Sequence, residues 1–205
     1  MMRALAMSPV VEGCGYGAWM VFVASWWIAA LWVAKAAAKG ALRDRRLYWL
    51  GFVVGFVALF SFNLQPGAGP NAPLWRAPAI VQWLLVAAEL GGFAFAWWAR
   101  LHLGRLWSGM MTLREGHRVV DTGPYALVRH PIYTAFIGSS WAYALLVARP
   151  TALFGAAVLT VVMAVKARAE EAFLRRELGA ADYDAYAART PMLVPTGGGL
   201  WRNVS

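Results

Sequence analysis

Cysteine, histidine and acidic residues are scarce in this sequence. Cys14 is the one cysteine among 205 residues, which excludes an internal disulfide and a zinc site built on cysteine. His102, His117 and His130 are not spaced as metal ligands, so we expect no metal site. The sequence has only 10 acidic residues against 19 Lys and Arg, so the formal net charge is +9.

This positive charge suits either a nucleic-acid partner or a membrane protein. The chain is 60% hydrophobic and carries 12 Trp and 10 Phe, as expected at membrane interfaces and between packed helices. Lys and Arg of membrane proteins collect in cytoplasmic loops, and no basic run here alternates with aromatic residues in a soluble domain. We therefore expect a lipid bilayer around the chain and no nucleic acid. The first apolar run is long and follows almost no positive charge, unlike a cleavable signal.

Five apolar stretches predict an all-α integral membrane bundle of five transmembrane helices. They cover residues 16–34, 47–64, 79–99, 132–147 and 151–165. The last two stretches are joined by a short link, which predicts a tight hairpin. A helix needs about 20 residues to cross the hydrocarbon core, so these two shorter helices are expected to tilt, to thin the bilayer locally or to be buried among other helices. With the N-terminus outside, only Arg3, Arg76 and Arg149 of the 19 basic residues face outward. This places the C-terminus and the polar segments in the cytoplasm, at an inner or plasma membrane.

The division of the chain follows the same pattern. Residues 1–78 are expected to form an N-terminal two-helix membrane region and its loop, and residues 79–205 a core of three further helices with polar segments. Gly51 and Gly55 have the spacing that lets helices approach closely. Internal packing is the favoured interpretation over dimerisation, and the oligomeric state stays open.

The polar stretch at residues 117–133 precedes the fourth apolar segment. Residues 122–125 predict a turn and a short helix. Pro131 disfavours the helical conformation at His130 and is suited to the first position of the next helix. We expect Tyr125, Arg129, His130 and Tyr133 to gather at the mouth of the hairpin. On spacing alone, a belt of side chains facing lipid headgroups is the favoured interpretation, and a site is the alternative.

Two further groups of residues are candidates for chemistry. Glu170 and Glu171 point about 100° apart on a helix, so one can face the protein while the other meets solvent or Arg175. A solvated charge pair with Arg168 and Arg175 is the alternative. Glu89 lies within the third apolar segment, where an ionisable group usually faces a cavity or a partner. A proton-handling role and a buried structural hydrogen bond are both open for it.

The order of these motifs resembles a known family. The motifs are HxxVxxGPYxxVRHPxY, a hydrophobic hairpin, EE, LGxxxYxxY and a proline, over about residues 103–195. In this order they are similar to the isoprenylcysteine carboxyl methyltransferase / phospholipid methyltransferase superfamily. These are integral membrane enzymes that use S-adenosylmethionine. The resemblance implies a cytoplasmic cofactor pocket, built from the loop before helix 4 and the helix after helix 5.

The resemblance also implies the site residues. The cofactor contacts would be His117, Arg118, Val119, Val120, Tyr125, His130, Pro131, Ile132, Tyr133, Glu170 and Glu171. Lys166 stands where the prenylcysteine enzymes carry a substrate-binding Arg, and Arg168 follows two residues later. Lysine lacks the planar fork that grips a carboxylate with two hydrogen bonds. Carboxylate methylation is therefore less strongly indicated than in those enzymes. Lys166 and Arg168 are catalytic candidates by this resemblance, and Glu89 is one by its position in the third apolar segment, on the condition that it faces the pocket.

The expected function is transfer of a methyl group from S-adenosylmethionine to a lipophilic acceptor, prenylcysteine-like or lipid. A carboxylate, thiol, amine or hydroxyl remains possible as the methylated group. The acceptor is expected to enter sideways from the bilayer, between the third and fourth helices. An intramembrane NADPH-dependent reductase and a non-catalytic scaffold or transporter are the alternatives.

Overall fold

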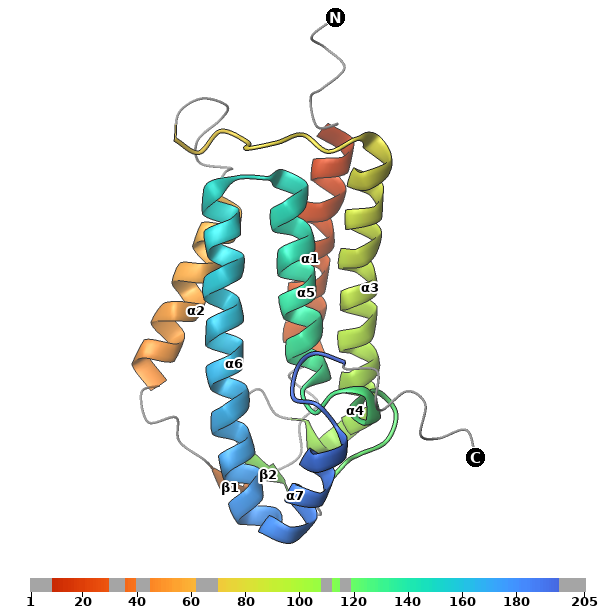
Figure 1. Cartoon of the computed structure of the whole chain (residues 1–205), viewed down its shortest axis with the longest axis vertical. Helices are drawn as coiled ribbons and strands as arrows, with labels where there is room; N and C mark the ends of the chain where they lie inside the picture. Colours follow the sequence, from red (N-terminus) through yellow and green to blue (C-terminus); the bar gives the residue numbers. More distant parts are fainter. Residues whose placement is uncertain are drawn as a thin grey trace, which may run out of the picture.

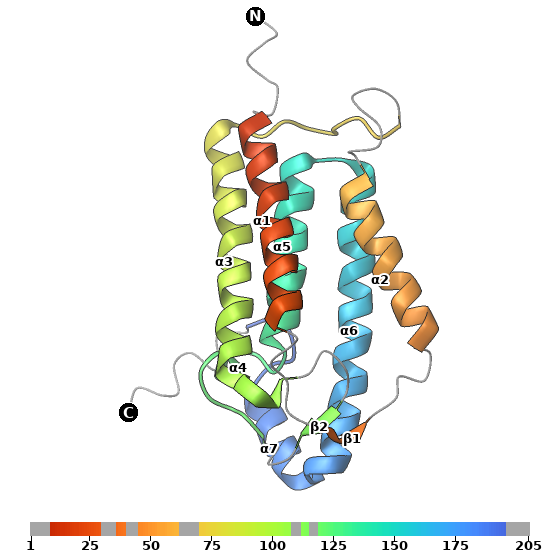
Figure 2. The same ribbon diagram turned by 180° about the vertical axis from the view of Figure 1, so that it is seen from behind.

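The fold is a bundle of five long helices, seen in a computed structural model that describes residues 9–29, 36–39, 45–61, 70–107, 112–114 and 119–195. Consecutive long helices run in opposite directions (Figures 1 and 2). Helix α3 packs along α5, α2 packs along α6, and α5 and α6 join these two pairs. The long helices are α1 (Pro9–Ala29), α2 (Arg45–Phe60), α3 (Ala79–Leu103), α5 (Pro131–Val147) and α6 (Pro150–Leu178).

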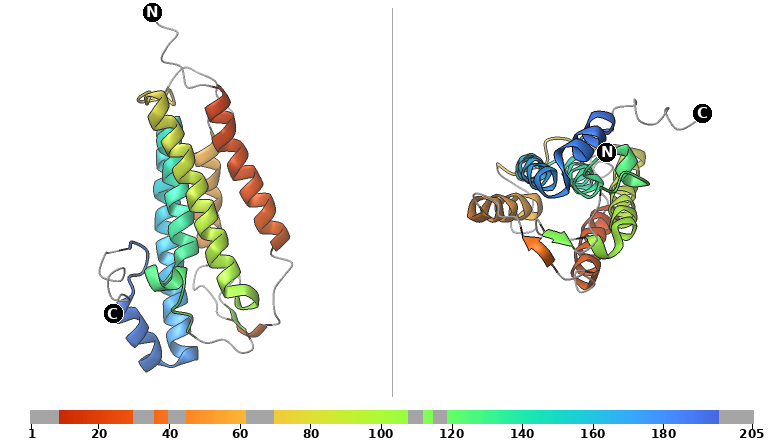
Figure 3. Two further views of the ribbon diagram at one scale, coloured as in Figure 1. Left: turned by 90° about the vertical axis from the view of Figure 1, so that its right-hand side faces the viewer. Right: turned by 90° about the horizontal axis from the view of Figure 1, so that it is seen from below.

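The short elements gather at one end of the bundle (Figure 3). They are the strands β1 (Ala36–Lys39) and β2 (Thr112–Arg114), the 3-10 helix η3 (Gly104–Leu106), and the helices α4 (Pro124–Leu127) and α7 (Ala180–Arg189). The all-α prediction is confirmed for the bundle. The antiparallel β1–β2 ladder was not predicted, because it pairs two loops far apart in the sequence and neither carries a strand pattern of its own.

Among the residues that the structure describes, two helices, α3 and α6, are long and apolar enough to cross a membrane. The predicted segment at residues 132–147 corresponds to the shorter apolar helix α5, and the segment at 47–64 overlaps the shorter apolar helix α2, which ends at Phe60. Residues 62–64 of that segment and residues 30–34 of the first predicted segment lie outside the described residues. Helix α6 has 29 residues and is about 43 Å long, more than the roughly 30 Å of a hydrocarbon core. It continues straight through Lys166, so the predicted fifth span and the polar helix after it are one element. Its C-terminal third extends beyond the apolar part and carries polar residues toward the site.

The core is aromatic. Trp19 of α1 is fully buried and packs edge-on against Phe93, Phe136 and Phe60, from α3, α5 and α2. Edge-to-face contacts stabilise aromatic pairs beyond the area that they bury. One side chain thus links four of the five long helices.

Glycines allow α2 and α6 to approach closely. A Cβ on Gly55 would lie 2.8 Å from Leu159 Cγ, and one on Gly155 would lie 2.5 Å from the backbone nitrogen of Leu59. Gly51 likewise faces Val162 of α6. The close spacing of Gly51 and Gly55 therefore serves internal packing.

The link between α5 and α6 is fixed at the opposite end of the bundle. Ala148 adopts the left-handed conformation, with φ of 55°. Asn71 accepts hydrogen bonds from the backbone and hydroxyl of Thr151 at 3.1 and 2.8 Å. The predicted tight hairpin is thereby confirmed, and its turn is tied to the segment that leads into α3.

Candidate active site

A cavity of about 540 Å³ opens at the end of the bundle that carries α4 and α7. Its volume is within the range of sites for small ligands. The polar end contains Arg129, His130, Lys166 and Glu170. The apolar end lies between α1 and α2 and is lined by Phe22, Val23, Trp26, Trp27, Tyr48, Trp49, Phe52 and Phe56. One cavity therefore offers a polar and an apolar compartment.

The turn at residues 122–125 shapes one wall. Gly123 has φ of 58°, a conformation that side chains disfavour, and a Cβ there would lie 2.7 Å from the His102 ring. Helix α4 starts directly after it with Pro124, which confirms the predicted turn and short helix. His102 bonds the Thr122 hydroxyl at 2.9 Å, and its ring stacks on Tyr125, a cavity residue.

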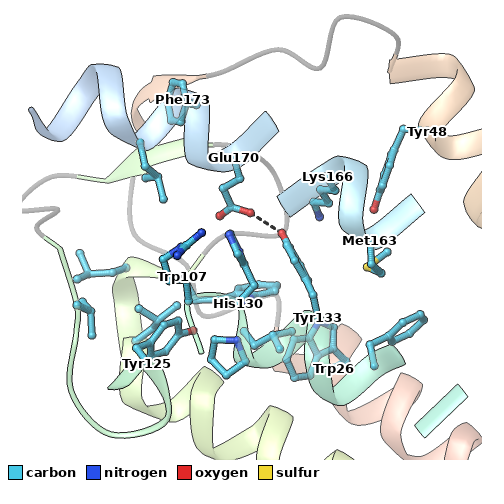
Figure 4. A pocket seen from close by; sticks show the side chains of 18 of the residues that line it. Trp26, Tyr48, Trp107, Tyr125, His130, Tyr133, Met163, Lys166, Glu170 and Phe173 are labelled. Carbon is cyan, nitrogen blue, oxygen red and sulfur yellow. Dashed lines mark hydrogen bonds between the residues drawn. The ribbon is translucent and has the colours of Figure 1, made fainter. Parts of the chain in front are cut away.

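The start of α5 forms the opposite wall. The helix begins at Pro131, as predicted, and His130 precedes it in a non-helical conformation. The rings of His130 and Tyr133 stack at 5.3 Å with 4° between their planes. The Tyr133 hydroxyl donates to Glu170 Oε2 at 2.5 Å, as Figure 4 shows. Glu170 thus reaches the cavity from α6 in a fixed orientation.

Glu171 lies behind this wall. Its Oε1 accepts a hydrogen bond from Arg129 Nε at 2.7 Å and lies 3.2 Å from His130 Nε2. Burial alone would raise the pKa of Glu171, but the hydrogen bonds from His130 and Arg129 outweigh it and lower the pKa to about 2. The two adjacent glutamates therefore diverge as predicted. The partner of Glu171 is Arg129, and Arg175 pairs instead with Asp184.

The segment after α7 holds the site loop from outside. The backbone N–H groups of Arg129 and His130 donate to the carbonyls of Pro191 and Met192 at 2.8 and 3.1 Å. The Thr134 hydroxyl donates to the Leu193 carbonyl at 2.6 Å. Residues 191–193 therefore lie along the loop that presents His130.

Lys166 stands where the two compartments meet. It lies one turn before Glu170 on α6, is 9% exposed, and its Nζ is 5.4 Å from the Tyr48 ring centroid and 5.2 Å from that of Tyr133. Burial lowers its pKa, while the nearby Glu170 charge opposes this effect. Aromatic faces stabilise a cation at such distances, so Lys166 is a positive group within a mostly aromatic wall.

The structure brings together nine of the residues that the sequence nominated. Val119, Val120, Tyr125, His130, Pro131, Ile132, Tyr133, Lys166 and Glu170 all line the cavity. Glu171 contacts His130 from behind the wall and is not itself a lining residue. Arg168 is exposed and also lies outside the lining, and His117 and Arg118 lie outside the described residues.

Glu89 lies away from the cavity. It is fully buried in α3, where a Cβ on Gly15 of α1 would be 3.2 Å from its Oε2. Leu103, at the other end of the same helix, is the residue of α3 that reaches the cavity. Glu89 itself is not among the residues that line the cavity.

Several lining residues were not nominated from the sequence. Trp26, Tyr48 and Phe52 come from α1 and α2, which carry no recognisable motif, so no local signal could identify them. Tyr183 and Tyr186 belong to the LGxxxYxxY motif, and the Tyr186 hydroxyl donates to the Tyr125 carbonyl at 2.7 Å. That motif was the signal from which they could have been found.

Comparison with known proteins confirms the resemblance seen in the motifs. Residues 83–176 match the isoprenylcysteine carboxyl methyltransferase (ICMT) family. The chain is also similar to the nickel-cobalt-cadmium resistance protein NccN of Alcaligenes xylosoxydans xylosoxydans, with 32% identity over 95 residues. This match covers 45% of the chain and 44% of the relative, so the chain spans less than half the length of that protein.

Proposed function

We propose that this chain is an integral membrane methyltransferase that moves a methyl group from S-adenosylmethionine to a lipophilic acceptor. The observation that carries the proposal is the cavity that holds Glu170, His130 and Tyr133 at one end and an aromatic compartment at the other. The family match over residues 83–176 includes all the polar residues at that end and supports the same chemistry.

The polar compartment fits the cofactor. Glu170 Oε2 accepts from Tyr133, and the described residues provide no hydrogen bond to its Oε1. A carboxylate oxygen so placed can accept hydrogen bonds from ribose hydroxyls or an ammonium group. The faces of Trp107 and Tyr125 in the same compartment suit an adenine ring or a positively charged sulfur. When bound, S-adenosylmethionine supplies a methyl group on a sulfonium.

The residues of the chain would act by holding the reactants in place. Alignment of donor and acceptor is worth several kcal/mol in a displacement that needs no covalent intermediate. Glu171 and Arg129 fix His130, and Tyr133 fixes Glu170, so the polar wall is rigid before a ligand arrives. The aromatic lining excludes water, and electrostatic interactions are stronger in its absence.

The acceptor would occupy the apolar compartment between α1 and α2. This differs from the expectation of entry between the third and fourth helices, because α3 and α5 pack along each other and the cavity lining passes to α1 and α2. Lys166 borders the compartment and would interact with the head of the acceptor. A carboxylate, thiolate, phenolate or amine is each compatible with the displacement.

In this proposal the chain crosses the membrane five times, with the cavity and the C-terminus in the cytoplasm. The up-and-down arrangement of α1, α2, α3, α5 and α6 supports it, as does the asymmetry of Lys and Arg between the loops. The cofactor would then enter from the cytoplasm and the acceptor from the bilayer.

Calorimetric titration of the purified protein with S-adenosylhomocysteine tests the proposal. We expect binding to the wild type and a loss of roughly tenfold or more in affinity, about 1.4 kcal/mol, in His130→Ala and Glu170→Ala. Arg176→Ala changes an exposed residue of the same helix and is the control. Unchanged binding in both cavity variants would refute the site, and binding of NADPH in place of the methyl donor's product would favour the reductase.

Mass spectrometry of lipid extract incubated with an isotopically labelled methyl donor would then identify the acceptor.

A further inference from the structure

Glu89 is a buried carboxyl group that the proposed reaction does not use. It is 0% exposed in α3, and neither carboxylate oxygen has a hydrogen-bond partner among the described residues. None of the ion pairs among the described residues includes Glu89. An isolated carboxylate loses its hydration on burial, at a cost that proteins normally avoid by neutralising the group.

The surroundings of Glu89 are built to contain a side chain of this size. Gly15 of α1 faces it, and a Cβ there would lie 3.2 Å from Glu89 Oε2 and 3.1 Å from Leu146 Cδ2. On the α5 side, Ser139 Oγ donates to the Glu89 backbone carbonyl at 3.0 Å. Gly92 makes this contact possible, since a Cβ there would lie 2.2 Å from the same hydroxyl. Three helices, α1, α3 and α5, therefore close around the carboxyl group, and they run side by side in Figures 1 and 2.

Among the residues that the structure describes, no salt bridge brings a positive charge close to Glu89. Tyr143 of α5 is fully buried beside Gly15, and Glu12, Tyr16, Glu89 and Arg149 act on it electrostatically. Of these groups only Arg149 is a cation, and its Nη1 donates to the Asn71 carbonyl at 3.1 Å, at the turn between α5 and α6. The described residues gather no three His, Cys, Asp or Glu side chains that could hold a metal ion.

We propose that Glu89 is a proton-binding site within the membrane bundle, occupied at neutral pH. The proton makes the group a neutral carboxylic acid, which removes the cost of a buried charge. The site is separate from the methyl-transfer cavity, since Glu89 is not among the residues that line that cavity. The inference therefore holds or fails independently of the proposed function.

Infrared spectroscopy of the purified full-length chain in an ester-free detergent tests this site. A protonated carboxyl group gives a carbonyl band distinct from the carboxylate bands, and ¹³C labelling of glutamate assigns that band to Glu. We expect the band in the wild type at neutral pH, its loss in Glu89→Gln, and its retention in the matched control Glu12→Gln. Glutamine keeps the shape of the side chain and removes the proton.

Two results would overturn the proposal. One is a wild-type spectrum with no protonated glutamate band at neutral pH, with the band arising only on acidification. The other is a band that survives in folded Glu89→Gln. If Glu89→Gln does not fold, the wild-type spectrum remains decisive for occupancy, and Glu12→Gln together with the partly exposed Glu170→Gln tests whether another glutamate produces the band.

Discussion

Arg129 Nε and Glu171 Oε1 lie 2.7 Å apart and join the loop before α5 to the polar part of α6. The same carboxylate oxygen lies 3.2 Å from His130 Nε2. Arg129 also donates to the carbonyls of Ala187 and Thr190 at 3.0 and 2.5 Å. One guanidinium therefore fixes three segments behind the cavity, and His130 depends on it through Glu171.

Replacing Arg129 by lysine should weaken cofactor binding without unfolding the bundle. Lysine keeps the charge but has one nitrogen in place of the fork that reaches both Glu171 and the carbonyls of Ala187 and Thr190. We expect the affinity for S-adenosylhomocysteine to fall about tenfold, or about 1.4 kcal/mol, by calorimetry. Arg175→Lys is the control, because Arg175 pairs with Asp184 at the surface, where both side chains are half exposed. Equal affinity in Arg129→Lys and the wild type would show that the contacts of Arg129 with Glu171 and with the Ala187 and Thr190 carbonyls have no part in shaping the cavity.

The ion pair between Arg129 and Glu171 should make the stability of the fold depend on pH in the acidic range. The pKa of Glu171 is about 2 in the folded chain, against about 4.3 for an unperturbed glutamate. A carboxyl group with a lowered folded pKa stabilises the fold above its unfolded pKa, and this stabilisation is lost as the pH falls toward the folded value. We expect the thermal midpoint of the wild type to fall between about pH 4.3 and 2. The difference between wild type and Glu171→Gln should be largest at neutral pH and vanish near pH 2. A constant difference across this range would disprove the assignment.

The sequence predicted the parts of the site that lie close together along the chain. The turn at residues 122–125, the helix start at Pro131 and the divergence of Glu170 and Glu171 all follow from local rules, and the structure confirms each of them. The contacts between distant segments did not follow. Arg129 was expected at the mouth of the hairpin, but its pairing with Glu171 spans 42 positions and depends on how α6 passes the loop.

The aromatic compartment escaped prediction for a different reason. Trp26 and Tyr48 stand in apolar runs in which every aromatic residue is equally suited to face lipid, core or cavity. The mean apolar character of a membrane helix hides which side is internal, because lipid and protein interior are similarly apolar. Glu89 shows the converse: an ionisable residue in such a run does mark a special position, but the sequence cannot tell whether it belongs to the cavity.

Close packing of α2 on α6 should be sensitive to a single methyl group. Gly155→Ala places a Cβ 2.5 Å from Leu59 N and 2.6 Å from the Gly55 carbonyl, and backbone atoms cannot move aside as a flexible side chain can. We expect a loss of about 1–3 kcal/mol in stability, measured by thermal unfolding in detergent. Gly138→Ala is the matched control, since a Cβ there meets nothing within 4 Å and alanine favours a helix over glycine by about 1 kcal/mol. If both variants unfold at the wild-type temperature, the two helices are not held in this register.

Lys166 should affect the acceptor more than the cofactor. Its ammonium group lies between the rings of Tyr48 and Tyr133, where the polar and apolar compartments meet. If it holds the head of an anionic acceptor, Lys166→Gln removes the charge and Lys166→Arg retains it. We expect Lys166→Gln to raise the KM for such an acceptor about tenfold, with the Kd for S-adenosylhomocysteine changed less than about twofold, and Lys166→Arg to recover most of the loss.

Phe52→Ala, which enlarges the apolar compartment, serves as a comparison, because it should alter the preference for the acceptor's apolar part irrespective of head charge. An equal loss of cofactor affinity in Lys166→Gln would instead place this lysine in the cofactor compartment. A KM that falls in Lys166→Gln would indicate a cationic acceptor head, because a buried positive charge repels an ammonium group.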